Sequence, residues 1–227
     1  MRKEPSAMNI NTVTVTGIGK ISASPDFVTI SCTVSAKDKN YSALTETEAE
    51  KMSEIISALI KAGFEEKDIK TSDFNLSTEY ENCPTSDNKW VRRFTGYSLT
   101  RDLKFEFDLD TDRLNSVIAA LTSCEKAAPT FNISFTVKEK DGLYDLLLEK
   151  AVRDAAHKAG VIAAAAGMKL GSVQNISYGS GESPFMSPTL FRGEADGAGP
   201  LRCAAKMNIV PEDIVSETNV TVVYQLS

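Results

Sequence analysis

The side chains best suited to chemistry are few in this chain of 227 residues, which holds one histidine and four cysteines. His157 falls on a helical pattern beside charged residues, where no orienting partner is indicated, so we expect it to be exposed to solvent. The cysteines lie tens of residues apart, which excludes a Cys-x-x-Cys redox pair and the common zinc spacings. They are Cys32, Cys83, Cys124 and Cys203. The sequence predicts no catalytic residue, no metal site and no cofactor.

The four cysteines fall into two kinds of surroundings. Cys32 and Cys124 lie in or beside apolar segments, and we expect reduced thiols there that pack as small hydrophobic side chains. Cys83 and Cys203 lie in loop-like segments, where a thiolate could be exposed. These two leave open an alternative function, a thiol-dependent antioxidant enzyme.

Two further motifs resemble ligand sites only in part. Segment 16–20 lacks the four residues that separate the glycines of a phosphate loop, and a strand follows it instead of a helix. Asp108, Asp110 and Asp112 have the opening spacing of a calcium loop without its later glycine and closing glutamate. We therefore expect a bulge or a tight backbone approach at the two glycines, and strand-end and helix-capping roles for the carboxylates.

Composition indicates a globular protein, with 42% hydrophobic and 25% charged residues and no segment that predicts a transmembrane helix. The net charge of −6 argues against a nucleic-acid partner, because Arg92 and Arg93 form the only close basic pair beyond the first residues. No apolar run follows the basic N-terminus, so no signal peptide is indicated. We expect a cytoplasmic protein as the chain stands, or a periplasmic or cell-envelope protein if a leader was removed.

Hydrophobic periodicity predicts an α+β fold with a largely antiparallel sheet, helices packed on one face, and the element order ββαββαβαββ. Strands over 12–22 and 27–34 are expected to form a hairpin across Ser24-Pro25-Asp26, and a second hairpin is expected to have its tip at 81–88. The other predicted elements are helices over 41–62, Leu114–Leu121 and 141–167, and strands over 131–137, 170–178 and 214–226.

The longest predicted helix, 141–167, carries many alanines on its core stripe, which favours a close approach to the sheet or to another helix. Gly160 interrupts this helix at a cost of about 1 kcal/mol relative to alanine. We therefore expect a packing reason for Gly160. The predicted stripe consists of Leu143, Leu147, Leu148, Ala151, Val152, Ala155, Ala159, Ile162 and Ala166.

A Gly/Pro/Ser-rich insert at about 179–202 is predicted to be flexible, as is the N-terminus over 1–11, within an otherwise single domain over 12–227. Large apolar side chains inside the insert have no obvious core of their own. They are candidates for contact with a second copy or a partner protein, and the alternative is that they pack back onto the parent domain. These residues are Phe185, Met186, Leu190, Phe191 and Leu201.

Short motifs follow one another in a consistent order from Val13 to Leu226. They are Gly17-x-Gly19, Ser24-Pro25-Asp26, the run from Gly63 to Thr71, Leu76-x-x-x-Tyr80, Gly96-Tyr97, the run from Ala151 to Ala159, the run from Gly167 to Ile176, and Val220 to Tyr224. Together these motifs resemble the SIMPL-domain family. The resemblance implies an α+β fold, ring-like or channel-like self-association in some bacterial envelope members, and a link to oxidative-stress defence. It implies no established enzymatic activity and no catalytic residues.

The resemblance and the scarcity of catalytic groups together predict a non-catalytic, self-assembling protein. We expect a homo-oligomer that acts in stress defence or envelope organisation. Two alternatives stay open, the thiol-dependent antioxidant enzyme and an adaptor that binds another protein, which is the role the resemblance implies for animal relatives.

Overall fold

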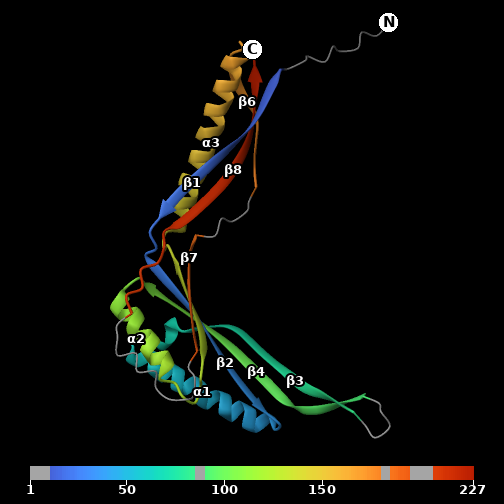
Figure 1. Ribbon diagram of the computed structural model, residues 1–227, viewed down its shortest axis with the longest axis vertical. Helices are drawn as coiled ribbons and strands as arrows, with labels where there is room; N and C mark the ends of the chain where they lie inside the picture. Colours follow the sequence, from blue (N-terminus) through green and yellow to red (C-terminus); the bar gives the residue numbers. More distant parts are fainter. Residues whose placement is uncertain (1–10, 85–89, 180–184, 195–206) are drawn as a thin grey trace. The chain divides into compact units, whose positions relative to one another are not determined.

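The computed structural model describes residues 11–84, 90–179, 185–194 and 207–227, and the chain packs as two compact units (Figure 1). Unit 1 comprises Met1–Ser24, Val137–Met186 and Asp213–Ser227, and unit 2 comprises Pro25–Thr136 and Ser187–Glu212. Each unit has its own sheet with helical structure packed on it, which confirms the predicted α+β class with antiparallel strands. The strands are divided between two sheets.

In unit 1 one long helix packs on a three-stranded sheet. The strands β1 (Thr12–Ala23), β8 (Ile214–Leu226) and β6 (Leu170–Tyr178) lie in the order β1-β8-β6. Helix α3 (Lys140–Ala165) packs mainly on β1 and β8. Its contact row is buried and consists of Leu147, Ala151, Ala155, Ala159 and Ala163. The small side chains of this row bring the helix and sheet backbones close together, as expected from the alanine content.

The approach of α3 to the sheet is tightest at Gly17 and Gly19 on β1. A Cβ atom at Gly17 would overlap the carbonyl oxygen of Ala151, and a Cβ atom at Gly19 would overlap that of Leu147. β1 pairs with β8 in unbroken register from Thr12 to Ala23. Of the two explanations offered for these glycines, the tight backbone approach is therefore right and the bulge is wrong.

Unit 2 is a five-stranded sheet with two helices packed on it. Its strands are β2 (Phe27–Asp38), β3 (Lys70–Pro84), β4 (Trp90–Asp108), β5 (Thr130–Thr136) and β7 (Met186–Glu194), in the order β3-β4-β2-β5-β7. The helices are α1 (Tyr41–Lys61), the short 3-10 helix η1 (Glu66–Asp68) and α2 (Thr111–Thr122). Side chains of α1, α2, β2, β4 and β5 form one core, in which Phe105, Phe131 and Phe135 are among the largest fully buried residues.

The predicted hairpin between the first two strands is wrong. β1 pairs with β8, whereas β2 lies between β4 and β5. The backbone N–H of Asp26 donates to the carbonyl of Thr136, and the Asp26 carbonyl accepts from Leu109. These bonds direct the chain from β1 into the other sheet, because a turn sequence specifies a change of direction but not the next pairing partner. The second predicted hairpin, β3 with β4, is confirmed.

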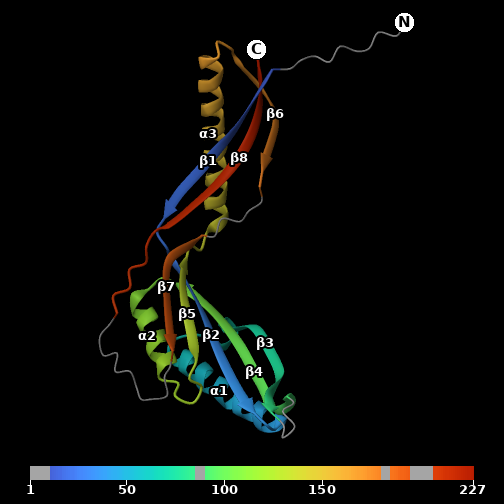
Figure 2. The ribbon, with the colours of Figure 1, turned by 45° about the vertical axis from the view of Figure 1, so that its right-hand side comes forward.

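Strand β7 was not predicted, because it lies inside the Gly/Pro/Ser-rich insert. It extends the sheet of unit 2 beside β5 (Figure 2). The Ser187 hydroxyl donates to the Glu212 carbonyl at 2.7 Å, and the ring of Phe191 stacks on that of Phe131 with centroids 6.4 Å apart. Such distant contacts stabilise a strand in a segment whose composition favours a loop.

Some residues of the predicted core stripe of α3 lie outside its buried contact row. Val152 and Ile162, both placed in the stripe, are 37% and 45% exposed. A Cβ atom at Gly160 would meet no atom within 4 Å, so the expected packing reason for this glycine is not found among the described residues. The buried row repeats every fourth residue, so residues in the adjacent rows lie on the flanks of the helix and stay partly exposed.

Candidate interaction surfaces

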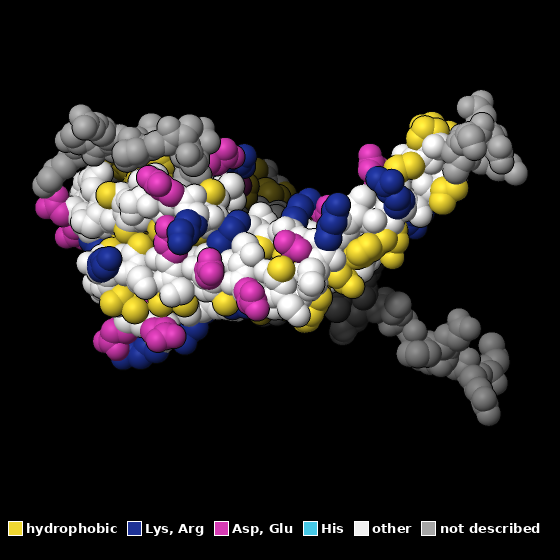
Figure 3. All heavy atoms as spheres, turned by 90° about the horizontal axis from the view of Figure 1, so that it is seen from below, with side chains coloured by type: hydrophobic (Ala, Val, Ile, Leu, Met, Phe, Trp, Pro, Cys, Tyr) yellow, Lys and Arg dark blue, Asp and Glu magenta, His cyan; other side chains and the backbone are white. Residues whose placement is uncertain are grey.

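A large uncovered apolar surface lies on the hairpin formed by β3 and β4 in unit 2. Residues directly opposite each other on paired strands share a face, and the register of this hairpin therefore sorts its side chains into two faces. One face carries rings and apolar groups that are 41–72% exposed (Figure 3). This surface, the aromatic face, consists of Phe74, Leu76, Tyr80, Trp90 and Phe94.

The aromatic face is uncovered because the hairpin extends beyond the helix that covers the neighbouring part of the sheet. Helix α1 begins at Tyr41, whose ring lies edge to face with that of Tyr97 on β4 at 5.9 Å between centroids. β4 starts at Trp90, seven residues before Tyr97, and Trp90 is 72% exposed. The strands continue past the helix, and their apolar side chains stay in solvent.

The rings of the aromatic face pack in a row. The centroids of Tyr80 and Phe94 are 5.8 Å apart, and those of Phe94 and Tyr97 are 5.1 Å apart, both in edge-to-face geometry. The guanidinium carbon of Arg92 lies 4.7 Å from the centre of the Tyr80 ring. Edge-to-face and cation–π contacts hold these groups in position, so the surface is formed before any partner binds.

The opposite face of the hairpin is polar and carries the acidic side chains of β3. They are Asp73, Glu79 and Glu81. Lys37 on β2 donates to the Glu79 carboxylate at 2.6 Å, and this hydrogen bond lowers the pKa of Glu79. The charged groups on the aromatic face, among the described residues, are Arg92 and Arg101. The acids of β3 therefore lie on the face opposite the rings, together with Arg93, which is paired with Glu81 across the two strands.

Arg101 connects the aromatic face to the core of unit 2. Its guanidinium carbon lies 5.0 Å from the centre of the Phe74 ring. Its Nε lies 2.8 Å from Oε1 of Glu48 on α1, without the alignment of a hydrogen bond. The Glu48 side chain is only 8% exposed, so the guanidinium is the charge partner of a nearly buried carboxyl group. This pair is structural in character.

The five candidate contact residues of the insert differ in their surroundings. Phe185 is buried against the Tyr144 ring in unit 1, and Phe191 packs on the core of unit 2. Met186 and Leu190 are 48% and 60% exposed, and Leu201 lies outside the described residues. The structure does not bring the described four together into one patch of exposed side chains. Contact of a partner with Met186 and Leu190 stays a prediction.

Two of the cysteines lie in the core of unit 2, as expected. Burial raises the pKa of Cys32 to about 12 and that of Cys124 to about 11. The Cys124 thiol also donates to the carbonyl of Ala120. A thiol with such a pKa is almost wholly protonated at neutral pH and is a poor nucleophile. Cys83 on β3 is partly exposed, and Cys203 lies outside the described residues.

A groove of about 540 Å³ runs between α1 and α2, and several of its polar groups are engaged in hydrogen bonds. The Glu54 carboxylate accepts a hydrogen bond from the backbone N–H of Ala127, while Ser116 and Ser123 donate to carbonyls of their own helix. Cys124 also lines this groove. We therefore interpret the groove as a packing surface between two helices and not as the site of an activated nucleophile.

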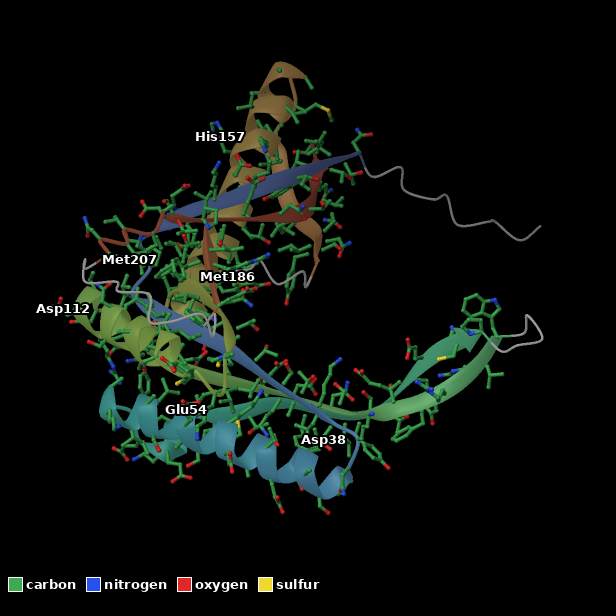
Figure 4. The ribbon with its side chains drawn as sticks, turned by 60° about the horizontal axis from the view of Figure 1, so that its bottom comes forward. Asp38, Glu54, Asp112, His157, Met186 and Met207 are labelled. Carbon is green, nitrogen blue, oxygen red and sulfur yellow. The ribbon has the colours of Figure 1, made fainter. Side chains whose placement is uncertain are left out.

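The remaining titratable candidates have structural roles or lie in solvent. Asp110 caps α2 by accepting from the backbone N–H of Arg113 at 2.7 Å, as expected for a capping carboxylate. His157 is exposed on α3 (Figure 4). In the part of the chain that the structure describes, no three His, Cys, Asp or Glu side chains are grouped as metal ligands. No helix within the described ranges has the length and hydropathy of a membrane span.

The sequence analysis located the β3–β4 hairpin but missed its aromatic face. The available signal was the alternation of Phe74, Leu76 and Tyr80 with polar residues, in a hairpin longer than the adjacent helix can cover. Periodicity shows that one side of a strand is apolar, and only the packing of α1 shows where that side is left uncovered.

Comparison with known proteins agrees with the motif pattern. The sequence model of SIMPL, described as a protein of unknown function (DUF541), matches residues 13–224. The 26 kDa periplasmic immunogenic protein of Brucella melitensis biotype 1 is 27% identical over 199 residues, which cover 88% of this chain and 77% of that protein. Its counterpart in Brucella abortus strain S19 is 26% identical over 199 residues, with the same coverage of both chains. Since the family match covers almost the whole chain, this protein belongs to the SIMPL family.

Proposed function

We propose that this protein is a non-catalytic module that self-associates, with the aromatic face of the β3–β4 hairpin as a contact surface. The observation that carries the proposal is the group of exposed rings at Tyr80, Phe94 and Trp90, of which Tyr80 and Phe94 pack edge to face. Exposed apolar surface of this kind is costly in water, and it marks interaction sites in soluble proteins. Tyr, Trp and Arg are also the side chains most enriched at the centres of protein interfaces.

Charge favours a second copy of the chain as the occupant of the aromatic face. The chain has 31 acidic and 25 basic residues, and its surface therefore carries an excess of negative charge. Arg92 lies among the rings, whereas the acids of β3 lie on the opposite face. Exposed acids such as Glu46 and Glu50 on α1 are available in every copy. A cationic, aromatic surface is thus complementary to the chain's own acidic surface.

The setting that we propose is the bacterial periplasm. Both Brucella relatives are described as periplasmic, and this supports the periplasmic alternative over the cytoplasmic one. An assembly in that compartment would serve stress defence or the organisation of the envelope, as the resemblance to SIMPL proteins implies. The alternative of thiol chemistry rests on Cys83 and Cys203, because Cys32 and Cys124 are buried with raised pKa values.

Light scattering coupled to size-exclusion chromatography tests the proposal at tens of micromolar protein. We expect an oligomeric wild type, a smaller mass for Trp90→Ser, and an unchanged mass for Val91→Ser. The two residues are neighbours with 72% and 50% exposure, but Val91 lies on the polar face of the hairpin. A strictly monomeric wild type would overturn self-association. An oligomer insensitive to Trp90→Ser would retain self-association and reject the aromatic face.

A further inference from the structure

Among the strands that the structure describes, four lie at sheet edges, and three of these carry features that discourage pairing with another strand. Edge strands are β1 and β6 in unit 1 and β3 and β7 in unit 2. Charged side chains and proline on an edge protect it from a further strand. β3 carries Lys70, Asp73, Glu79 and Glu81, and β7 carries Pro188, Arg192 and Glu194.

The outer edge of β1 is closed by side chains of α3. The Asp154 carboxylate accepts from the backbone N–H of Ile18 at 2.7 Å. Lys158 donates to the carbonyl of Thr16 at 3.0 Å, and Lys150 donates to a third backbone group of the same edge at 3.3 Å. These partners satisfy backbone groups that a further strand would need.

Strand β6 has neither kind of protection. Its sequence from Leu170 to Tyr178 contains no charged residue and no proline. Every residue from Gly171 to Tyr178 is exposed, and no described strand pairs with β6 on the side away from β8. Pairing with β8 is irregular near Val173 and regular from Asn175 to Tyr178. The regular half is therefore an open edge with backbone groups in ladder geometry.

The side chains of β6 also leave an apolar row uncovered on the α3 side of the sheet. Its members lie opposite buried residues of β8, and opposite residues share a face. The row consists of Val173, Ile176 and Tyr178, which are 46%, 50% and 58% exposed. The flank of α3 that faces away from the β1 edge is apolar as well, with Leu148, Val152 and Ala156. The helix covers β1 and β8 and leaves β6 bare.

We propose that β6 of a second copy pairs antiparallel with β6, so that two three-stranded sheets join into one of six strands. The inference rests on the proposed self-association and identifies a contact of unit 1 in it. An extended backbone can pair with a row of edge N–H and C=O groups in ladder geometry, and antiparallel pairing of identical strands gives closed two-fold symmetry. The uncharged strand lets two acidic chains approach here without repulsion.

This geometry also covers the exposed row. The two-fold axis between antiparallel strands is perpendicular to the sheet, so equivalent faces of both copies point the same way. The rows of Val173, Ile176 and Tyr178 from the two copies would lie side by side, with an α3 helix on either side of them. The apolar side chains that α3 leaves bare within one copy are then covered by the other copy.

A charge exchange at Ile176 tests the pairing by light scattering. In the proposed register Ile176 lies at the two-fold axis, next to its copy in the other chain. We expect Ile176→Lys and Ile176→Glu each to raise the dissociation constant of the β6 contact about tenfold or more, because like charges then meet across the axis. An equimolar mixture of the two variants should recover most of the wild-type association, because opposite charges then face each other. Ser177→Lys, on the opposite face of the strand, gives a second variant whose side chain lies in solvent.

Ile18→Lys is the matched control, since Ile18 is 45% exposed on the closed edge of the same sheet. We expect it to leave the mass unchanged. Variants without a wild-type far-UV circular dichroism spectrum are excluded from the comparison. If the wild type assembles and the Ile176 and Ser177 variants keep its mass, the β6 pairing is wrong while self-association stands. Loss of mass without recovery in the mixture also contradicts the pairing, and a monomeric wild type contradicts both proposals.

Discussion

Asp154 on α3 accepts a hydrogen bond at 2.7 Å from the backbone N–H of Ile18, a residue 136 positions away on β1. The same carboxylate lies 2.6 Å from the ammonium group of Lys158, one helical turn further along α3. An exposed ion pair of this kind contributes little to stability by itself. Its position at a strand edge gives it a second role, because it occupies the backbone donor that a foreign strand would require.

This arrangement predicts a pH dependence for the stability of unit 1. The hydrogen bonds from Lys158 and from the Ile18 backbone lower the pKa of Asp154 from its ordinary value of 3.8. The contribution of Asp154 is therefore fully present above pH 3.8 and is lost as the pH falls through the lower pKa of the folded state. We expect Asp154→Asn to unfold at lower urea concentration than the wild type near pH 6, and this difference to shrink in acid.

The control for this experiment is Asp145→Asn, at an exposed position of the same helix. It should leave the urea midpoint unchanged near pH 6. A wild-type advantage over Asp154→Asn that stays constant from pH 6 to below the folded-state pKa would contradict the role assigned to the carboxylate.

A pair of glycine substitutions tests the contact between α3 and β1. Gly17→Ala places a methyl group against the backbone of Ala151, and we expect it to destabilise unit 1 by about 1–3 kcal/mol. Gly160→Ala places the same group in open space within a helix, and we expect it to stabilise the protein by about 1 kcal/mol. Urea unfolding followed by circular dichroism measures both. Equal effects of the two substitutions would show that the approach at Gly17 is not tight.

The elements of this fold could largely be predicted from the sequence because each carries a local period. The alternation in β3 and the four-residue row from Leu147 to Ala163 in α3 are signals that a short window contains. The pairing of β1 with β8 could not be predicted, since Val15 lies opposite Val222 across more than 200 residues. A turn at Pro25 is equally compatible with a hairpin and with a passage into a second sheet.

Which apolar side chains of the candidate surfaces are exposed also depends on contacts between residues far apart in the sequence. Phe185 and Phe191 look alike in a Gly/Pro-rich segment, yet they pack on different units through Tyr144 and Phe131. Tyr80 and Phe94 read as ordinary strand residues until the end of α1 at Tyr41 shows that no helix covers them. What a strand contributes depends on its neighbours, and these are set by the whole chain.

The cysteines give a prediction that separates packing from thiol chemistry. The pKa of Cys32 rises from 9.0 to about 12, which lowers its thiolate fraction at pH 8 about a thousandfold. We therefore expect a disulfide reagent to leave Cys32 and Cys124 unmodified in the folded protein and to react with the partly exposed Cys83. Peptide mapping by mass spectrometry identifies each labelled cysteine, including Cys203.

Unfolding in guanidinium provides the internal control for this experiment, because all four cysteines should then react. Folded protein in which Cys32 is labelled as fast as Cys83 would show that the core of unit 2 opens readily. Peroxide consumption by the wild type that is lost in Cys83→Ser would support the antioxidant alternative over the proposed function.

The pair of Glu48 and Arg101 predicts an asymmetry between removing one charge and removing both. Arg101→Met leaves the nearly buried carboxylate of Glu48 without its cation, and we expect a loss of about 2–3 kcal/mol in the free energy of unfolding, reduced by the partial exposure of Arg101. The double variant Glu48→Leu with Arg101→Met removes both charges and should recover most of that loss.

Lys67→Met breaks an exposed pair with Glu65 and should change stability by about 0.5 kcal/mol or less. Urea unfolding at neutral pH compares the three, and a loss for Arg101→Met no larger than that for Lys67→Met would mean that water still solvates Glu48.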